Sequence, residues 1–173
     1  IDIQAQSYGN LMRGDGLALS MVTQGITTAI LGEGSTPAPV NDKVLALETD
    51  SASKALMRRF TGPHGFGEWL EFMAKRGVSQ NVGSFLGNGT VRVYGNGGAM
   101  GPSSSVEIDT MQAMVRRAMQ DGAFGIASAL IYPPNTYAST EELIAVNKAT
   151  APYGGVYITH MRSEGDKFLE AMD

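Results

Sequence analysis

Residues 123–160 read AFGIASALIYPPNTYASTEELIAVNKATAPYGGVYITH, and they contain two short apolar runs separated by a helical pattern. The runs are 123–130 and 156–160, and turn residues bound both of them, which is typical of buried strands. Between the runs, Ser139 and Glu142 have the spacing of a capping box, which predicts the start of a helix. A strand, a helix and a second strand in this order indicate parallel strands joined by a crossover.

The same alternation extends toward the N-terminus. Ser104 and Glu107 form a second capping box, and Gly122 follows as a left-handed stop. Apolar side chains spaced three and four apart predict a further helix that ends at Gly77. On these patterns we predict strands at 1–6, 26–31 and 80–86, and helices at 11–23, 66–77 and 104–122.

Five strand–helix units predict an α/β protein, and two architectures are consistent with this pattern. One is an open sheet of five parallel strands, and the other is part of an eight-stranded (β/α)8 barrel, which typically takes about 250 residues. Residues 35–65 are irregular, with three prolines and a short helical stretch at 55–60, and we expect an excursion between strands rather than a separate domain. A last helical pattern begins at 166 and stops at 173, so we expect a piece of a longer chain.

Composition narrows the possible functions. The 173 residues, 43% of them apolar, suffice for one domain with a sizeable core. No apolar run approaches the roughly 20 residues that span a bilayer, so no membrane partner is expected. A net charge of -4 with 13 scattered basic residues argues against nucleic-acid binding. The absence of cysteine excludes disulfides, thiolate metal ligands and cysteine nucleophiles.

The ends of the predicted strands carry the candidate site. His160 directly follows an apolar strand, and Glu33 lies between two glycines at the end of another. Taken alone, each has a structural alternative: a hydrogen-bonded core histidine and a solvated loop acid. Together, a carboxylate and an imidazole could supply two of three ligands to Zn²⁺. We expect His64, in a Pro-His-Gly turn, to lie at the surface.

Two further features leave alternatives open. Arg162 could form a local ion pair with Glu164, or it could bind a substrate carboxylate through two hydrogen bonds. The glycine-rich segment 95–98 suggests an open-sheet nucleotide-binding domain, but the sixth position of the required motif is Met100. The glycines are better explained as turn residues.

Three stretches carry a family resemblance. They are QGITT at 24–28, GAFG at 122–125 leading to LIYPP at 130–134, and YITHMRSE at 157–164. Together and in this order they resemble the N-acyl-D-amino-acid deacylases, which belong to the amidohydrolase superfamily. The similarity runs nearly from end to end of the chain.

The resemblance implies a zinc-dependent hydrolase on a (β/α)8 barrel, of which residues 1–173 would form one incomplete domain, from strand one to the start of the helix after strand five. The histidine matching His160 binds the metal in the family. Glu33 lies where the family has a cysteine ligand, and we expect it to replace that ligand. The tyrosine matching Tyr132 contacts the scissile carbonyl, and Arg162 is expected to contact substrate.

One departure from the family concerns a second metal. Family members commonly carry His-x-His at the end of strand one, whereas this chain has Gln4 and Gln6 there. Neutral amides are poor zinc ligands, so the second metal position is predicted to be weak or empty. A non-catalytic ligand-binding barrel that has lost metal chemistry is therefore an alternative.

For the full-length protein, the resemblance implies hydrolysis of the amide bond of N-acyl-D-amino acids with one Zn²⁺ per chain. A further histidine ligand and the general acid/base would lie beyond residue 173, so the 173 residues alone are predicted to be inactive. Uncovered barrel edges predict an oligomer or a missing partner segment. A cytoplasmic location is expected, with the periplasm as the alternative.

Overall fold

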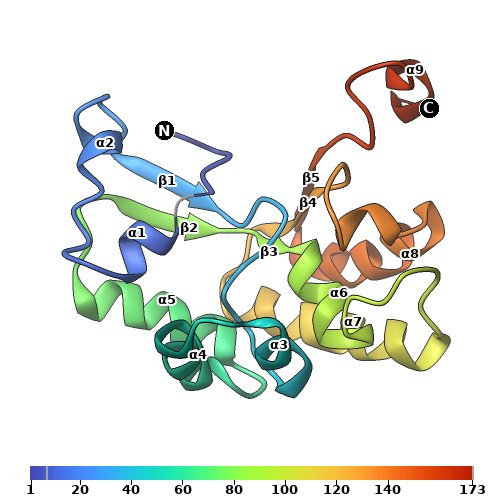
Figure 1. Cartoon of the computed structure of the whole chain (residues 1–173), viewed down its shortest axis with the longest axis horizontal. Helices are drawn as coiled ribbons and strands as arrows, with labels where there is room; N and C mark the ends of the chain where they lie inside the picture. The colour runs from blue at the N-terminus through green and yellow to red at the C-terminus, as the bar shows by residue number, and fades with distance from the viewer. Residues whose placement is uncertain (7, 173) are drawn as a thin grey trace.

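The computed structural model describes residues 1–6 and 8–172 and has a mixed α/β fold (Figure 1). Every pair of hydrogen-bonded strands is parallel. One sheet has the order β1–β2 and the other has the order β3–β4–β5, so neighbours in each sheet follow chain order. The strands are β1 (Thr28–Leu31), β2 (Asn81–Ser84), β3 (Leu86–Gly87), β4 (Gly125–Ala129) and β5 (Val156–His160).

The chain passes from the first sheet to the second within one residue. Phe85 separates β2 from β3, and its N–H donates to the carbonyl of Leu31 at 2.9 Å. The carbonyl of Ser84 accepts from the N–H of Phe124 at 3.0 Å, just before β4. β2 continues through Phe85 into β3, and all pairings are parallel. The carboxyl ends of β1 and β5 therefore come to the same side of the molecule.

Two predicted helices are confirmed with their end signals. Ser104 caps α7 at both bonds of the capping box with Glu107, and α5 ends at Gly77, whose φ is 77°. Both helices pack their apolar stripes into the core, where Phe66 and Trp69 make an edge-to-face contact. The helices are α1 (Tyr8–Met12), α2 (Leu19–Val22), α3 (Asp42–Leu47), α4 (Ser51–Met57), α5 (Gly65–Arg76), α6 (Asn88–Asn96), α7 (Ser105–Gln120), α8 (Thr140–Asn147) and α9 (Phe168–Met172), with short 3₁₀ turns at Arg58–Phe60, Asn135–Tyr137 and Lys148–Tyr153.

Two elements near the N-terminus differ from prediction. Residues 1–6 form no strand where described; only Asp2 makes an isolated parallel bridge, to Ala29. The helix expected at 11–23 is interrupted, because Gly14 and Gly16 take left-handed φ values of 63° and 72° between α1 and α2. The first strand–helix unit is therefore less regular than its sequence pattern indicates.

The excursion at 35–65 is more helical than predicted, and one helix, α6, is absent from the helices predicted from the sequence. α3 and α4 lie within the excursion, and α6 begins at Asn88, directly after β3. The sequence NGTVRVYGN is poor in strong helix formers, so local propensity gives little signal for α6. Most of its residues are buried, which indicates that tertiary packing stabilises this helix.

A buried ion pair explains why the predicted capping box of Ser139 and Glu142 is only half formed. Ser139 accepts the N–H of Glu142 at 3.1 Å, as expected. The carboxylate of Glu142 instead binds Arg92, whose side chain is fully buried. Arg92 also donates to the carbonyls of Ala99 and Gly101, so the pair joins α6, α8 and the segment before α7.

None of the helices in the described part of the chain has the length and apolar character needed to cross a membrane.

Candidate active site

Glu33 and His160 converge at the carboxyl ends of β1 and β5. Glu33 Oε1 lies 3.9 Å from His160 Nε2, and the side chains are 3% and 30% exposed. Two atoms that bind one tetrahedral zinc ion at about 2.1 Å each are roughly 3.4 Å apart. The observed separation therefore needs only a small adjustment for both atoms to bind one metal ion.

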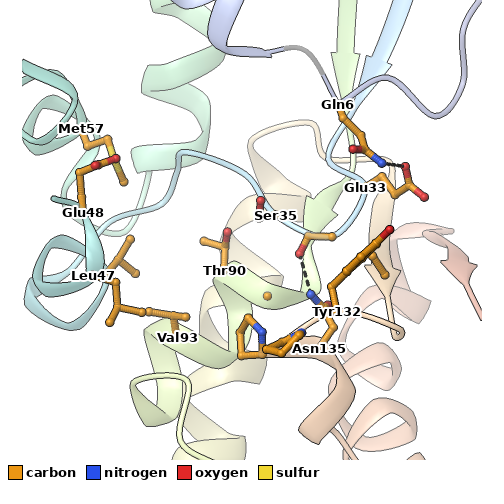
Figure 2. Close-up of a pocket in the computed structure, with 16 residues that line it drawn as sticks. Gln6, Glu33, Ser35, Leu47, Glu48, Met57, Thr90, Val93, Tyr132 and Asn135 are labelled. Carbon is orange, nitrogen blue, oxygen red and sulfur yellow. Dashed lines mark hydrogen bonds between the residues drawn. The ribbon is translucent and has the colours of Figure 1, made fainter. Parts of the chain in front are cut away.

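The amides of Gln4 and Gln6 hold the Glu33 carboxylate. Gln4 Nε2 donates to Oε1 at 2.8 Å and Gln6 Nε2 donates to Oε2 at 2.6 Å; Figure 2 shows the second of these bonds. Both amides thus present N–H groups, which cannot bind a metal, toward Glu33. The segment 1–6 contributes hydrogen-bond donors to the site.

Glu164 holds the other side of the imidazole. Its Oε1 lies 2.6 Å from His160 Nδ1, which leaves Nε2 on the side of Glu33. A carboxylate on the second ring nitrogen is the usual partner of a metal-binding histidine, because it fixes the tautomer and the ring orientation. Arg162 donates to the carbonyl of Ala138 at 2.7 Å. Glu164 and Arg162 therefore have different partners, and these contacts replace the local ion pair considered between them.

Tyr132 lies beside His160 in the segment that follows β4. Its ring centroid is 6.3 Å from that of the imidazole, in an edge-to-face arrangement, and its side chain is more than half exposed. In Figure 2 the hydroxyl end of Tyr132 points toward the side of the pocket that carries Glu33. This position leaves the hydroxyl free to contact a ligand bound next to Glu33.

The loop that carries Glu33 is fixed against the start of α6. The carbonyl of Gly34 accepts from the N–H of Gly89 at 2.7 Å and from the Asn135 amide at 3.3 Å. Thr90 exchanges two hydrogen bonds with the backbone of Thr36, at 2.9 and 2.7 Å. Sequence reasoning missed the roles of Thr90 and Asn135, since neither follows a strand directly.

Only glycine fits at the closest point of this contact. A Cβ on Gly87 would lie 2.3 Å from the Cα of Ser35. Gly87, the last residue of β3, therefore permits the close approach that positions Glu33.

A pocket of about 400 Å³ extends from Glu33 (Figure 2). This volume is within the range of small-molecule sites. Its lining comes from the loops after β1 and β4 and from α3, α4 and α6: Gln6, Glu33, Gly34, Ser35, Val44, Leu47, Glu48, Met57, Gly89, Thr90, Val93, Ala129, Tyr132, Pro133, Pro134 and Asn135.

The described residues form no group of three or more His, Cys, Asp or Glu side chains that could hold a metal ion. Glu33 and His160 supply two donors of the kinds that zinc and other first-row metals accept. His64 lies elsewhere, at the exposed start of α5, where its Nδ1 is 2.7 Å from Asp121 Oδ1.

Solved structures of known proteins identify the class of fold to which the chain belongs. No family model matches the chain. A solved D-aminoacylase, studied for the role of its binuclear metal centre, superposes with a TM-score of 0.82 at 27% identity, covering 99% of this chain and 35% of that one. The chain therefore has the mixed α/β fold of an amidohydrolase of the D-aminoacylase type.

Two curated sequences identify the proteins to which the chain is homologous. N-acyl-D-aspartate deacylase of Alcaligenes xylosoxydans xylosoxydans is 32% identical over 157 residues, which are 90% of this chain and 31% of that protein. D-aminoacylase of the same organism is 29% identical over 153 residues, which are 88% and 31% of the two proteins. The predicted resemblance to the N-acyl-D-amino-acid deacylases is confirmed: the chain is homologous to them and spans about a third of the length of these relatives.

Proposed function

We propose that the complete protein that contains this chain hydrolyses the amide bond of N-acyl-D-amino acids at a metal centre. The convergence of Glu33 Oε1 and His160 Nε2 to 3.9 Å at the ends of two parallel strands carries the proposal. The homologues support the substrate class, since they are named deacylases of N-acyl-D-amino acids or D-aminoacylases. That relationship also disfavours the alternative of a barrel that only binds ligands.

The proposed architecture is the first five strand positions of a (β/α)8 barrel, in which residues 1–6 take the first position through the Asp2–Ala29 bridge and β2 and β3 together take one position. Neighbouring strands follow chain order, and all of them are parallel. β5 ends its sheet, and Val156 and Tyr157 on it are exposed. A further strand of the complete protein would pair with this edge.

We propose one Zn²⁺ per complete chain, held by Glu33, His160 and residues outside this chain. Carboxylate oxygen and imidazole nitrogen are suitable donors, and Glu164 orients the imidazole as expected for a zinc ligand. Zinc in such a site lowers the pKa of bound water and polarises the scissile carbonyl. Gln4 and Gln6 present N–H groups to Glu33, so a second metal is not part of the proposal.

The protein side chains around this position orient the substrate and stabilise charge. The Tyr132 hydroxyl would donate a hydrogen bond to the carbonyl oxygen of the substrate as negative charge develops there. Arg162, two residues after His160, would place a positive charge near the carboxylate of the substrate, while its bond to Ala138 fixes the loop. Glu33 keeps its position through the two glutamine amides.

The test compares the two histidines of the chain in the complete protein. Hydrolysis of N-acetyl-D-leucine is expected, with little hydrolysis of the L-enantiomer, and a chelator should abolish it. His160→Ala should lower kcat/KM about a thousandfold or more, since metal catalysis contributes several kcal/mol, and should reduce bound zinc. The exposed His64→Ala is the matched control and should retain both. Full activity of His160→Ala, or a protein free of metal that is still active, would overturn the proposal.

A further inference from the structure

The pocket beside Glu33 leads away from the proposed metal centre toward the helices of the 35–65 excursion. Figure 2 shows Glu33, Gln6 and Tyr132 at one end, and Leu47, Glu48 and Met57 at the other. Ser35 and Thr90 lie between the two ends. α3 and α4 thus form the far wall of a cavity whose near end is the candidate active site.

The far end of this pocket is apolar. Leu47 on α3 is 60% exposed, and Val93 on α6 faces the same space. An added Cβ on Gly98 would contact Val93, Pro134 and Leu47 at 3.3, 3.6 and 3.9 Å, so these three side chains meet at one point. Met57 and Val44 extend the apolar surface. Leu47 is therefore an exposed leucine within a continuous apolar wall.

The charges of the pocket are all negative. Among its lining residues the charged side chains are Glu33 and Glu48, and no lysine, arginine or histidine contributes to the lining. Glu48 is held in place because its Oε1 accepts the N–H of Asp50 at 2.8 Å. An acidic group at the far end of this space would lose water and meet the Glu48 carboxylate, with no lysine, arginine or histidine in the lining to pair with it, which is unfavourable.

From these observations, and resting on the proposed function, we infer that the pocket binds an uncharged apolar chain attached to the scissile amide and excludes acidic groups. Leu47, Met57 and Val93 are the residues that determine this specificity. The chain can be the acyl group or the side chain of the D-amino acid, because both are attached to the amide. The excursion at 35–65 thereby acquires a function: it builds the specificity wall.

The experiment uses two substrate series with the complete protein. One series lengthens the acyl group of N-acyl-D-alanine from acetyl to hexanoyl, and the other compares N-acetyl derivatives of D-alanine, D-norleucine and D-aspartate. We measure kcat/KM, and we measure binding to chelator-treated protein by calorimetry, which does not depend on turnover. One series should gain about two- to fourfold per added CH₂, which identifies the group that enters the pocket. If the D-side-chain series shows this gain, D-aspartate should be at least about tenfold worse than D-norleucine.

Leu47→Asp tests the wall directly. It should remove most of the gain per CH₂ in both readouts. Leu19→Asp is the matched control, since Leu19 on α2 is 61% exposed and does not line the pocket; it should keep the gain.

The outcomes separate the two proposals. Binding that improves with chain length and is lost in Leu47→Asp, without hydrolysis, supports the pocket and overturns the deacylase function. Three results overturn the pocket and leave the deacylase function intact. They are hydrolysis with no dependence on chain length in either series, a preference for D-aspartate where the D-side-chain series shows the gain, and equal effects of Leu47→Asp and Leu19→Asp. If neither binding nor hydrolysis is observed, both proposals are overturned.

Discussion

Glu164 Oε1 lies 2.6 Å from His160 Nδ1, so His160 is held from the side opposite Glu33. This contact connects the loop after β5 to the orientation of the proposed metal ligand. A change at residue 164 should therefore alter metal binding even though Glu164 is not itself a proposed ligand.

We predict that Glu164→Ala lowers the metal affinity of the complete protein about 10- to 100-fold, because partners of metal-binding histidines contribute about this much. Competition with a chromogenic chelator measures it. Glu170→Ala is the control, because Glu170 on α9 is 74% exposed and pairs only weakly with Lys167. Equal affinity of the wild type and Glu164→Ala would show that the bond does not position His160.

The second prediction concerns the amides at 4 and 6. In Gln4→Leu/Gln6→Leu, Glu33 loses two hydrogen bonds at 2.8 and 2.6 Å, and its carboxylate becomes free to rotate. We expect metal affinity to fall about tenfold or more, measured by the same competition. Gln24→Leu removes an amide that donates to the carbonyl of Ser20 within α2 and its C-terminal turn, and it should leave the affinity unchanged. A double variant that binds metal like the wild type contradicts the positioning role.

Tyr132→Phe separates binding from catalysis. The hydroxyl is proposed to act when charge develops on the carbonyl oxygen, so kcat should fall about 10²- to 10³-fold while KM changes little. Steady-state kinetics on N-acetyl-D-leucine measure both constants. Tyr153→Phe is the control, since the Tyr153 hydroxyl contacts only Gln120 among the described bonds. A rise in KM at constant kcat would assign Tyr132 to ground-state binding instead.

The next prediction concerns the buried ion pair of Arg92 and Glu142. Removing one partner should destabilise the fold more than removing both. Arg92→Met leaves Glu142 buried without its cation and should cost about 3 to 5 kcal/mol of unfolding free energy. The double variant Arg92→Met/Glu142→Leu should cost less, since no charge is left unpaired. Denaturant unfolding measures both. The exposed pair of Lys75 and Glu71 is the reference, and Lys75→Met should cost less than about 1 kcal/mol.

The cap of α7 should make stability depend on pH in the acid range. Hydrogen bonds from the backbone N–H and then the hydroxyl of Ser104 hold the pKa of Glu107 below its ordinary value of 4.5. Because the folded pKa is the lower one, the contribution is fully present above 4.5 and is lost as the pH falls through the folded pKa.

Thermal unfolding from about pH 6 to about pH 3 measures this dependence. Glu107→Gln should show a shallower loss of stability below 4.5 than the wild type. Ser104→Ala removes the cap itself and should cost about 1 kcal/mol. Identical acid profiles of the wild type and Glu107→Gln would contradict the assignment.

The parts of the fold that sequence predicted well have local signals. Gly77 ends α5 and Ser104 begins α7, and in each case the residues that determine the boundary are within four positions of it. The convergence of Glu33 and His160 was expected because parallel strands bring their carboxyl ends to one side. That inference needs the strand order, not side-chain detail.

The parts that sequence did not predict depend on contacts between distant segments. Glu142 was expected to complete its local capping box, but it binds Arg92, 50 positions away. Gln4 and Gln6 occupy the positions where a weak second metal site is predicted, and that prediction stays open. The contacts of their N–H groups with Glu33, nearly 30 positions away, have no local signal in the sequence. Such choices between a local and a remote partner depend on burial, which one segment of sequence does not encode.

The close contact between residues 32–36, which carry Glu33, and residues 87–90 has a consequence for protein engineering. A side chain added at Gly87 would overlap the backbone of Ser35, and one added at Gly89 would overlap the carbonyl oxygen of Gly34. Libraries that aim to change substrate preference should therefore keep 32–36 and 87–90 constant and diversify 44–57. Randomising these two segments would return mostly misfolded or metal-free clones, whereas the wall formed by α3 and α4 can vary without moving Glu33.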